Sequence, residues 1–355
     1  MEDLEVSMRI MVTGHDGYIG KALVPLLQEA GHDVVGLDTF LYEDCTFGEP
    51  SAEIPAIRTD IRDVTVDQLR GFDAIVHLAA ISNDPVGDIN RETTMSINHE
   101  GTAHLGRVAR EAGVLRFVFS SSCSLYGAGS QGALDETAAF NPVTAYGESK
   151  VLAERALSAL ANEHFSPTCL RNATAYGLSS RLRADLVVNN LVGFAFLTGE
   201  VLMKSDGTPW RPLVHIEDIA RAFLAVLEAD RAKVHDEAFN VGRTEENYRI
   251  RDVARIVEEV VPGSRVVLAD TAGPDLRNYR VDCSKIERVL PAFRPVWTVR
   301  SGAEQLYEAY RRIGLTSEAF DGAALSRIRH VRSLIASGRL DETMRWRHEA
   351  PVAAT

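Results

Sequence analysis

Apolar and polar positions alternate in blocks along the first half of the chain. Short, continuous apolar runs are followed by segments whose apolar residues recur at helical spacing. We expect strands at 9–14, 33–38, 72–80 and 116–121, and helices at 20–31 and 93–113. Continuous apolar strands that alternate with helices are typical of a parallel sheet covered by helices on both faces.

After residue 165 the pattern becomes less regular. We expect strands at 168–177, 237–242 and 264–270, a helix at 185–199, a strand leading into an Asp-capped helix at 210–229, and amphipathic helices at 301–314 and 324–338. The chain contains no internal repeat and no linker rich in Gly, Ser or Pro. We therefore predict an α/β fold in which residues 1–167 form a Rossmann-type, doubly wound parallel sheet that also receives about 210–242. Residues 168–355 mainly form a smaller, interleaved substrate-binding lobe with the C-terminal helices.

Composition narrows the class of protein. The net charge of −12 over 355 residues argues against nucleic-acid binding, which needs a clustered basic face. The four cysteines are far apart and form no CxxC pair or His/Cys cluster, so we expect free thiols and no metal site. The acidic start runs directly into a strand, unlike a signal peptide, and no apolar run approaches the ~20 residues of a membrane helix. We expect a cytoplasmic protein with no membrane partner.

Three glycines end the first strand in "VTGHDGYIG". Gly14, Gly17 and Gly20 have the spacing GxxGxxG rather than the commoner GxGxxG. Glycines here would allow a tight turn, close approach of a pyrophosphate to the backbone, and an anion at a helix N-terminus. A purely structural turn is the alternative for the triplet alone.

A carboxylate follows at the end of the second strand. Asp38 can accept hydrogen bonds from ribose hydroxyls and would repel a 2′-phosphate, which favours NAD over NADP. Asp60 and Ile61, in "DIRD", are placed to hold the adenine edge. Together with the glycines, these residues predict a dinucleotide site.

Candidate chemistry lies in "FSSSCSLYG" (119–127) and "YGESK" (146–150). Tyr146 and Lys150 are four residues apart and share one face of a helix, although such a pair alone is also compatible with a solvated helix start. The serines end a central strand, where ligands bind in open α/β sheets. Tyrosine, with a reference pKa of ~10, becomes a base when an ammonium and a positive nicotinamide stabilise its phenolate. The residues predict a hydride-transfer site.

A set of short motifs follows in this order: "TGHDGYIG", "DIRD", "HLAA", "SINHEGT", "SSCSLYG", "YGESK", "RPLVHIED" and "DLRNYRVD". With these motifs the chain resembles the extended short-chain dehydrogenase/reductases over about residues 8–300, specifically the nucleotide-sugar epimerase/dehydratase group. The resemblance implies a catalytic set of Ser122, Tyr146 and Lys150 and a homodimer through helices 93–111 and 146–163. It implies NAD contacts at Gly14, Gly17, Tyr18, Ile19, Gly20, Asp38, Asp60, Ile61, Leu78, Ala79, Ala80, Asn98, Tyr146 and Lys150.

The two positions after Ser122 divide this group. Ser122 is assigned by its place four residues before Tyr126. The 4,6-dehydratases have Asp and Glu next, the sugar-nucleotide decarboxylases have Glu second, and the GDP-mannose 3,5-epimerases have Cys second. This chain has Cys123 and Ser124, so elimination lacks its expected acid and base. We predict an NAD-dependent nucleotide-sugar epimerase, acting at C4. The alternatives are an NAD(P)-dependent reductase or oxidoreductase, a 4,6-dehydratase, and a non-enzymatic NAD-binding protein.

A nucleotide-diphosphate sugar is the expected partner. Arg211, Arg277 and Asn190 match family positions beside the diphosphate, which suits the planar guanidinium, although each could instead make a structural ion pair or hydrogen bond. The segment "LRNAT" departs from the family's "LRxxN". The expected substrate-binding residues are Asn83, Asp84, Ser122, Cys123, Ser124, Asn172, Thr174, Asn190, Arg211 and Arg277. Asn83 and Asp84 could alternatively cap a turn. His77 and His215 are expected to be hydrogen-bonded locally, and the base and the sugar stay open.

Overall fold

A computed structural model describes residues 7–50, 52–82, 84–87, 89–273 and 278–347. Its central sheet has seven parallel strands in the order β11-β7-β5-β4-β1-β2-β3. The strands are β1 (Arg9–Thr13), β2 (Asp33–Asp38), β3 (Ala56–Arg58), β4 (Ala74–His77), β5 (Arg116–Ser122), β7 (Ser166–Asn172) and β11 (Glu237–Val241). The strand order reverses beside β1, as it does in dinucleotide-binding sheets, which confirms the predicted Rossmann-type fold.

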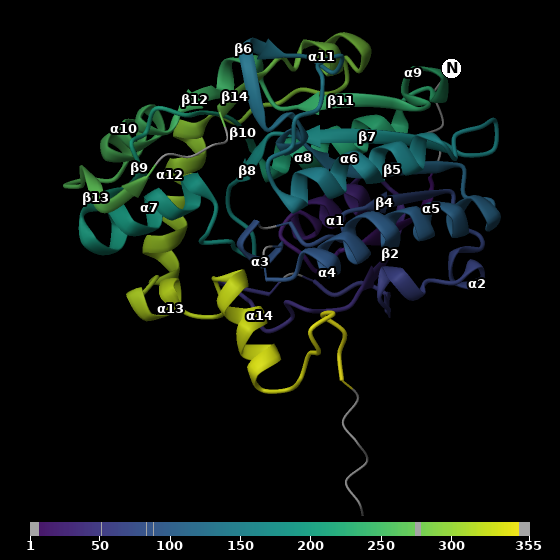
Figure 1. The fold of residues 1–355 in the computed structure, drawn as a ribbon, viewed down its shortest axis with the longest axis horizontal. Helices are drawn as coiled ribbons and strands as arrows, with labels where there is room; N and C mark the ends of the chain where they lie inside the picture. Colours follow the sequence, from purple (N-terminus) through teal and green to yellow (C-terminus); the bar gives the residue numbers. More distant parts are fainter. Residues whose placement is uncertain (1–6, 51, 83, 88, 274–277, 348–355) are drawn as a thin grey trace, which may run out of the picture.

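Helices cover both faces of this sheet (Figure 1). One face packs against α1 (Gly20–Glu29), α8 (Ile216–Glu228) and α11 (Ser284–Val289), and the other against α2 (Val66–Leu69), α5 (Thr102–Glu111) and α6 (Ala145–Ser158). Alternate residues of β1 enter the two cores, because side chains alternate across a strand: Ile10 and Val12 pack with α1 and α8, whereas Met11 packs with α5. This two-sided burial explains the continuous apolar strands.

A second core lies among helices later in the chain. Here α7 (Val187–Thr198), α10 (Ile250–Val260) and α12 (Val299–Ile313) pack with β9 (Glu200–Ser205) and β13 (Arg265–Gly273). The sheet of β8 (Thr174–Tyr176), β10 (Trp210–His215) and β12 (Asn247–Arg249) joins the two cores, because Leu213 packs with α7 and its neighbour Val214 packs with α8.

The remaining elements are short. They are α3 (Asp84–Gly87), α4 (Arg91–Met95), α9 (Arg231–Val234), α13 (Ser317–Asp321), α14 (Arg327–Ala336), the pair β6 (Ala128–Leu134) and β14 (Asn278–Val281), and the turns η1 (Ile61–Asp63), η3 (Cys123–Tyr126) and η4 (Thr244–Glu246). Among the helices of the described residues, none is long and apolar enough to cross a membrane.

Two local expectations need correction. The helix expected at 93–113 is divided by a π-helical segment, η2 (Ser96–Gly101), between α4 and α5. The cap of α8 is not an aspartate: His215 Nδ1 accepts the backbone N–H of Glu217 at 3.2 Å. Asp218 instead uses its carboxylate to accept the backbone N–H groups of Val296 and Trp297, at 3.0–3.2 Å. A non-local contact therefore outweighs the local capping preference.

Candidate active site

A cavity of about 990 Å³ lies along the carboxyl ends of β1, β2, β4, β5 and β7 and extends toward α7 and β9. Such an edge is where open α/β sheets bind ligands. Most of the predicted cofactor residues line it: Gly14, Gly17, Tyr18, Ile19, Gly20, Asp38, Asp60, Ile61, Leu78, Ala79, Ala80 and Tyr146. The structure therefore brings together residues that are far apart in the sequence.

The glycine loop packs too closely for side chains. Gly14 has a φ of +73°, and a Cβ there would lie 2.7 Å from the backbone nitrogen of Ala79. A Cβ on Gly20 would collide with the carbonyl of His15. The bare backbone and the N-terminus of α1 thus form a cradle that fits the pyrophosphate of a dinucleotide.

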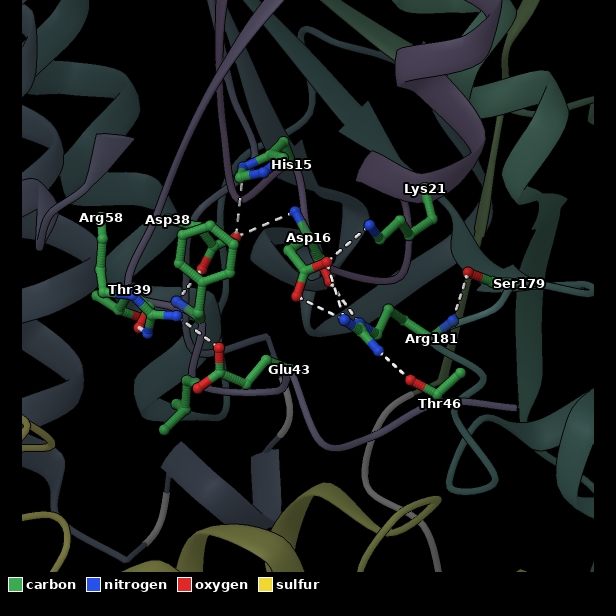
Figure 2. Close-up of polar contacts among 12 residues, drawn as sticks. His15, Asp16, Lys21, Asp38, Thr39, Glu43, Thr46, Arg58, Ser179 and Arg181 are labelled. Atoms are coloured by element: carbon green, nitrogen blue, oxygen red, sulfur yellow. Dashed lines mark hydrogen bonds and ion pairs between the residues drawn. The ribbon is translucent and has the colours of Figure 1, made fainter. Parts of the chain in front are cut away.

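Asp38 lies beside this loop (Figure 2). Its carboxylate accepts the backbone N–H of Asp16 at 3.1 Å and that of Phe40 at 2.9 Å. Burial raises the pKa of Asp38 to about 6, against the opposing effect of the Phe40 N–H. A carboxylate has about four acceptor sites, so capacity remains for ribose hydroxyls from the cavity side.

Asp16 is a cavity residue that the sequence analysis missed. Its carboxylate lies 2.7 Å from Lys21 Nζ and 2.8 Å from Arg181 Nη2, and its carbonyl accepts Arg181 Nε at 3.1 Å (Figure 2). Arg181 comes from the segment before α7, so this buried ion pair joins the glycine loop to the second core. The acid inside "GHDGYIG" and the arginines of "SRLRAD" were the available signals.

Helix α6 positions the tyrosine and the lysine. Thr144 caps the helix by accepting the N–H of Gly147 at 3.1 Å, which places Tyr146 in the first turn, at the cavity wall. Lys150 is only 3% exposed; its Nζ donates to the carbonyl of Ser120 at 2.7 Å and lies 5.6 Å from the ring centre of Tyr146. Burial lowers the pKa of Lys150 to about 7, although the negative charge of Glu154 opposes the shift. The lysine thus lies behind the tyrosine rather than on the described cavity wall.

The serine turn brings two serine residues to the cavity wall. Ser122 ends β5 and accepts the N–H of Ser124 at 3.1 Å, and both residues line the cavity. Ser124 Oγ is buried and has no hydrogen-bond partner among the described residues. The turn ends at Gly127, whose φ is +59° and where a Cβ would collide with the carbonyl of Asn141. The turn therefore requires glycine directly after Tyr126, the residue from which Ser122 was assigned.

Cys123 differs from the expectation that it faces the sugar. Its side chain is fully buried and Sγ donates to the carbonyl of Arg171 at 3.0 Å, away from the cavity. Burial raises the pKa of the thiol far above its ordinary range. The turn η3 directs Cys123 into the core while it leaves Ser122 and Ser124 at the wall.

Two predicted cofactor residues, Asn98 and Asp60, have side chains that are bonded to other residues of the protein. Asn98, in η2, accepts the N–H of Ile81 at 2.8 Å and donates to Ile81 O and Ser149 Oγ, so it supports the wall rather than forming it. Asp60 does line the cavity, but its carboxylate is paired with Arg62, at 2.6 Å from Nη2. At the position predicted to hold the adenine, the structure therefore has an ion pair rather than an isolated acid.

The predicted substrate residues Asn172, Thr174, Asn190 and Arg211 line the cavity. Asn172 donates to Ser120 Oγ at 3.0 Å, while its Oδ1 is buried without a partner among the described residues. Arg211 donates to the carbonyl of Trp210 at 2.8 Å. Tyr279, in "DLRNYRVD", also lines the cavity and was missed.

Three other predicted residues cannot be placed in this wall. Asn83 and Arg277 lie outside the described residues. Asp84 is the first residue of α3, and its side chain is also outside the described part of the structure. The two histidines are locally bonded as expected. His77 lies between the hydroxyls of Thr13 and Thr102, at 2.7 and 2.8 Å, and burial lowers its pKa to about 3. His215 bonds Gln305 at 2.9 Å.

Comparison with known proteins assigns this geometry to a family. The model of the NAD dependent epimerase/dehydratase family matches residues 10–242. The chain belongs to this family. It is 31% identical to a UDP-glucose 4-epimerase of Corynebacterium glutamicum over 275 residues, 71% of this chain and 80% of that protein.

Solved structures of relatives extend the match. MoeE5, in complex with UDP-glucose and NAD, is 28% identical with a TM-score of 0.74, covering 86% of this chain and 99% of that one. DesIV, a dTDP-glucose 4,6-dehydratase from Streptomyces venezuelae with NAD bound, is 26% identical with a TM-score of 0.74, covering 88% and 100%. NAD is thus the cofactor of this epimerase/dehydratase, and the glycine cradle and Asp38 described above fit it.

The raised pKa of Asp38 predicts a pH dependence of NAD binding. Only the ionised carboxyl is a full acceptor for ribose hydroxyls, so a pKa near 6 means that binding weakens as pH falls through 6. We expect the Kd for NAD, measured by calorimetry, to rise about tenfold from pH 7 to pH 5. In Asp38→Asn the Kd is higher throughout and nearly independent of pH; a pH dependence equal to that of the wild type would contradict this role.

Proposed function

We propose that this protein is an NAD-dependent 4-epimerase of a nucleotide-diphosphate sugar. The observation that carries the proposal is the composition of the wall beside Tyr146. Ser122 and Ser124 line that wall, although Ser124 Oγ itself is buried, and the thiol of Cys123 is buried against Arg171 O. The positions at which the dehydratases hold Asp and Glu are occupied by residues that cannot exchange a proton with C5 or C6 near neutral pH.

The chain's own residues supply proton transfer at the sugar C4 hydroxyl. Tyr146 takes the proton from this hydroxyl, and Lys150, fixed by its hydrogen bond to Ser120 O, stabilises the phenolate from behind the ring. Ser122 accepts the N–H of Ser124, which leaves its own proton available to orient the sugar oxygen. NAD, held by the glycine loop and Asp38, would supply the hydride acceptor and donor for C4.

Inversion requires the keto sugar to turn while its nucleotide stays bound. Arg211, in β10, and Asn190, in α7, line the cavity and are suited to hold the diphosphate. The cavity extends beyond the cofactor residues to α7 and β9, where a sugar nucleotide would lie. The division of the chain near residue 167, a homodimer through residues 93–111 and 146–163, and a cytoplasmic location stay predictions.

Isotope exchange from solvent tests the proposed reaction. UDP-, dTDP-, GDP- and CDP-hexoses are incubated with the enzyme in D₂O and their products are analysed by NMR and mass spectrometry. We expect inversion at C4 with no carbon-bound deuterium and no net absorbance change at 340 nm, because the hydrogen removed from C4 returns to C4. Deuterium at C5 or loss of water would favour a dehydratase, and a net change at 340 nm would favour an oxidoreductase.

A further inference from the structure

The last described residues, 339–347, form a strap that follows α14. Leu340 pairs with Trp346 in an antiparallel bridge, and the N–H of Arg347 donates to Arg339 O at 2.9 Å. Figure 1 shows this segment, in yellow, turning back from α14 toward the sheet. The strap lies beyond residue 242, where the match to the family model ends.

Four side-chain contacts fasten the strap to the dinucleotide-binding part of the chain. Trp346 Nε1 donates to Thr39 O at 2.7 Å, Arg62 Nη1 donates to Thr343 O at 3.1 Å, Thr93 Oγ1 donates to Glu342 O at 3.1 Å, and Arg345 Nη2 donates to Asp63 Oδ1 at 3.1 Å. Arg345 Nη1 is also 4.0 Å from Asp60 Oδ2. Apart from Thr93, in α4, the partners of the strap lie just after the ends of β2 and β3, where the adenine end of the cofactor is expected.

Met344 lies between these contacts and lines the cavity together with Thr39, Asp60 and Ile61. It is 5% exposed and belongs to an apolar cluster with Leu334 and Leu340. Its φ of +58° is in the left-handed region, which costs a residue with a side chain about 1 kcal/mol. The contacts on both sides hold the strained residue in place and so maintain an apolar side chain at the cavity wall.

We propose that the strap is the outer wall of the adenine site and slows release of NAD through contact of Met344 with the base. A thioether is suited to this contact because it is apolar, polarisable and adaptable to an aromatic ring. The inference rests on the proposed function in one respect: an epimerase has to keep its cofactor until the keto sugar has been reduced again. A strap that slows cofactor loss would serve that need.

The test compares Met344→Ala with Leu334→Ala in the full-length protein. Leu334 is 4% exposed in the same apolar cluster but does not line the cavity, so it controls for general loosening of the strap. We expect Met344→Ala to raise the Kd for NAD about tenfold, mainly through faster release followed by stopped-flow fluorescence. Leu334→Ala should stay within about twofold of the wild type.

A second, more conservative variant keeps the proposal testable if Met344→Ala does not fold. Trp346→Phe keeps an aromatic ring but removes the donor to Thr39 O, and we expect NAD release about threefold faster. An unchanged Kd in Met344→Ala, or an equal loss in Leu334→Ala, would overturn the strap's role. If NAD release accelerates as expected but the wild type leaves every sugar unchanged at C4, the strap is supported and the proposed reaction fails. A wild type that does not bind NAD overturns both.

Discussion

Tyr146→Phe is expected to lower the turnover of C4 epimerisation at least about a thousandfold. A general base contributes about 10²–10⁴-fold, and this phenol has to act in both the oxidation and the re-reduction. The substitution removes one oxygen and keeps the ring in the first turn of α6, where it lines the cavity. NAD binding should therefore persist within a few-fold. The measurement pairs the initial rate of epimerisation with the Kd for NAD of the same preparation.

The matched control is Tyr307→Phe. Tyr307 packs at the edge of the second core, against Phe196, and does not line the cavity. Its variant should retain the wild-type rate within about twofold. A Tyr146→Phe protein that binds NAD and still epimerises at the wild-type rate would exclude the phenol as the base and favour a non-enzymatic or differently catalysed role for the cavity.

Some parts of the site could be predicted from the sequence because they depend on residues that lie close together in the chain. The glycine loop and Asp38 each follow directly from the end of one strand, whereas Ser122 was assigned from the family resemblance, by its place four residues before Tyr126. In the first two cases the chemistry and the backbone requirement lie within a few residues of one another. The place of the glycine loop and Asp38 at the cavity could therefore be predicted without knowledge of the tertiary structure.

Residues whose position depends on distant contacts were not predictable in this way. Asp16 is fixed by Arg181, and Met344 by a strap anchored to Thr39 and Asp63. Each pairing spans more than a hundred residues or crosses between the two cores, so periodicity carries no information about it. Cys123 was misplaced for a related reason: the turn η3, rather than the alternation of strand β5, decides which side chains face the cavity.

Lys150→Met is expected to lower the rate of epimerisation about a hundredfold or more. It should also remove a pH-dependent contribution to the free energy of unfolding. The loss of activity follows because the phenolate of Tyr146 loses the positive charge behind its ring. Methionine has a similar length and keeps the apolar contact with Phe119, whose ring lies 4.6 Å from Nζ. Packing is thereby conserved while the charge is removed.

The effect on stability has a defined direction. Burial lowers the pKa of Lys150 to about 7 in the folded protein, against about 10.4 for lysine in an unfolded chain. Between these values the unfolded state binds more protons, so the wild-type free energy of unfolding gains a contribution that rises with pH from about 7 to about 10. Below 7 both states are protonated and the contribution is constant.

The two proteins should therefore diverge as pH rises. Urea unfolding of the NAD-free proteins at several pH values gives the wild-type free energy of unfolding minus that of Lys150→Met, in which other titrating groups largely cancel. We expect this difference to be flat below pH 7 and to increase between pH 7 and 10. Parallel curves across that window would mean that Lys150 is not desolvated in the folded protein and keeps its charge up to about pH 10, which would contradict the lowered pKa.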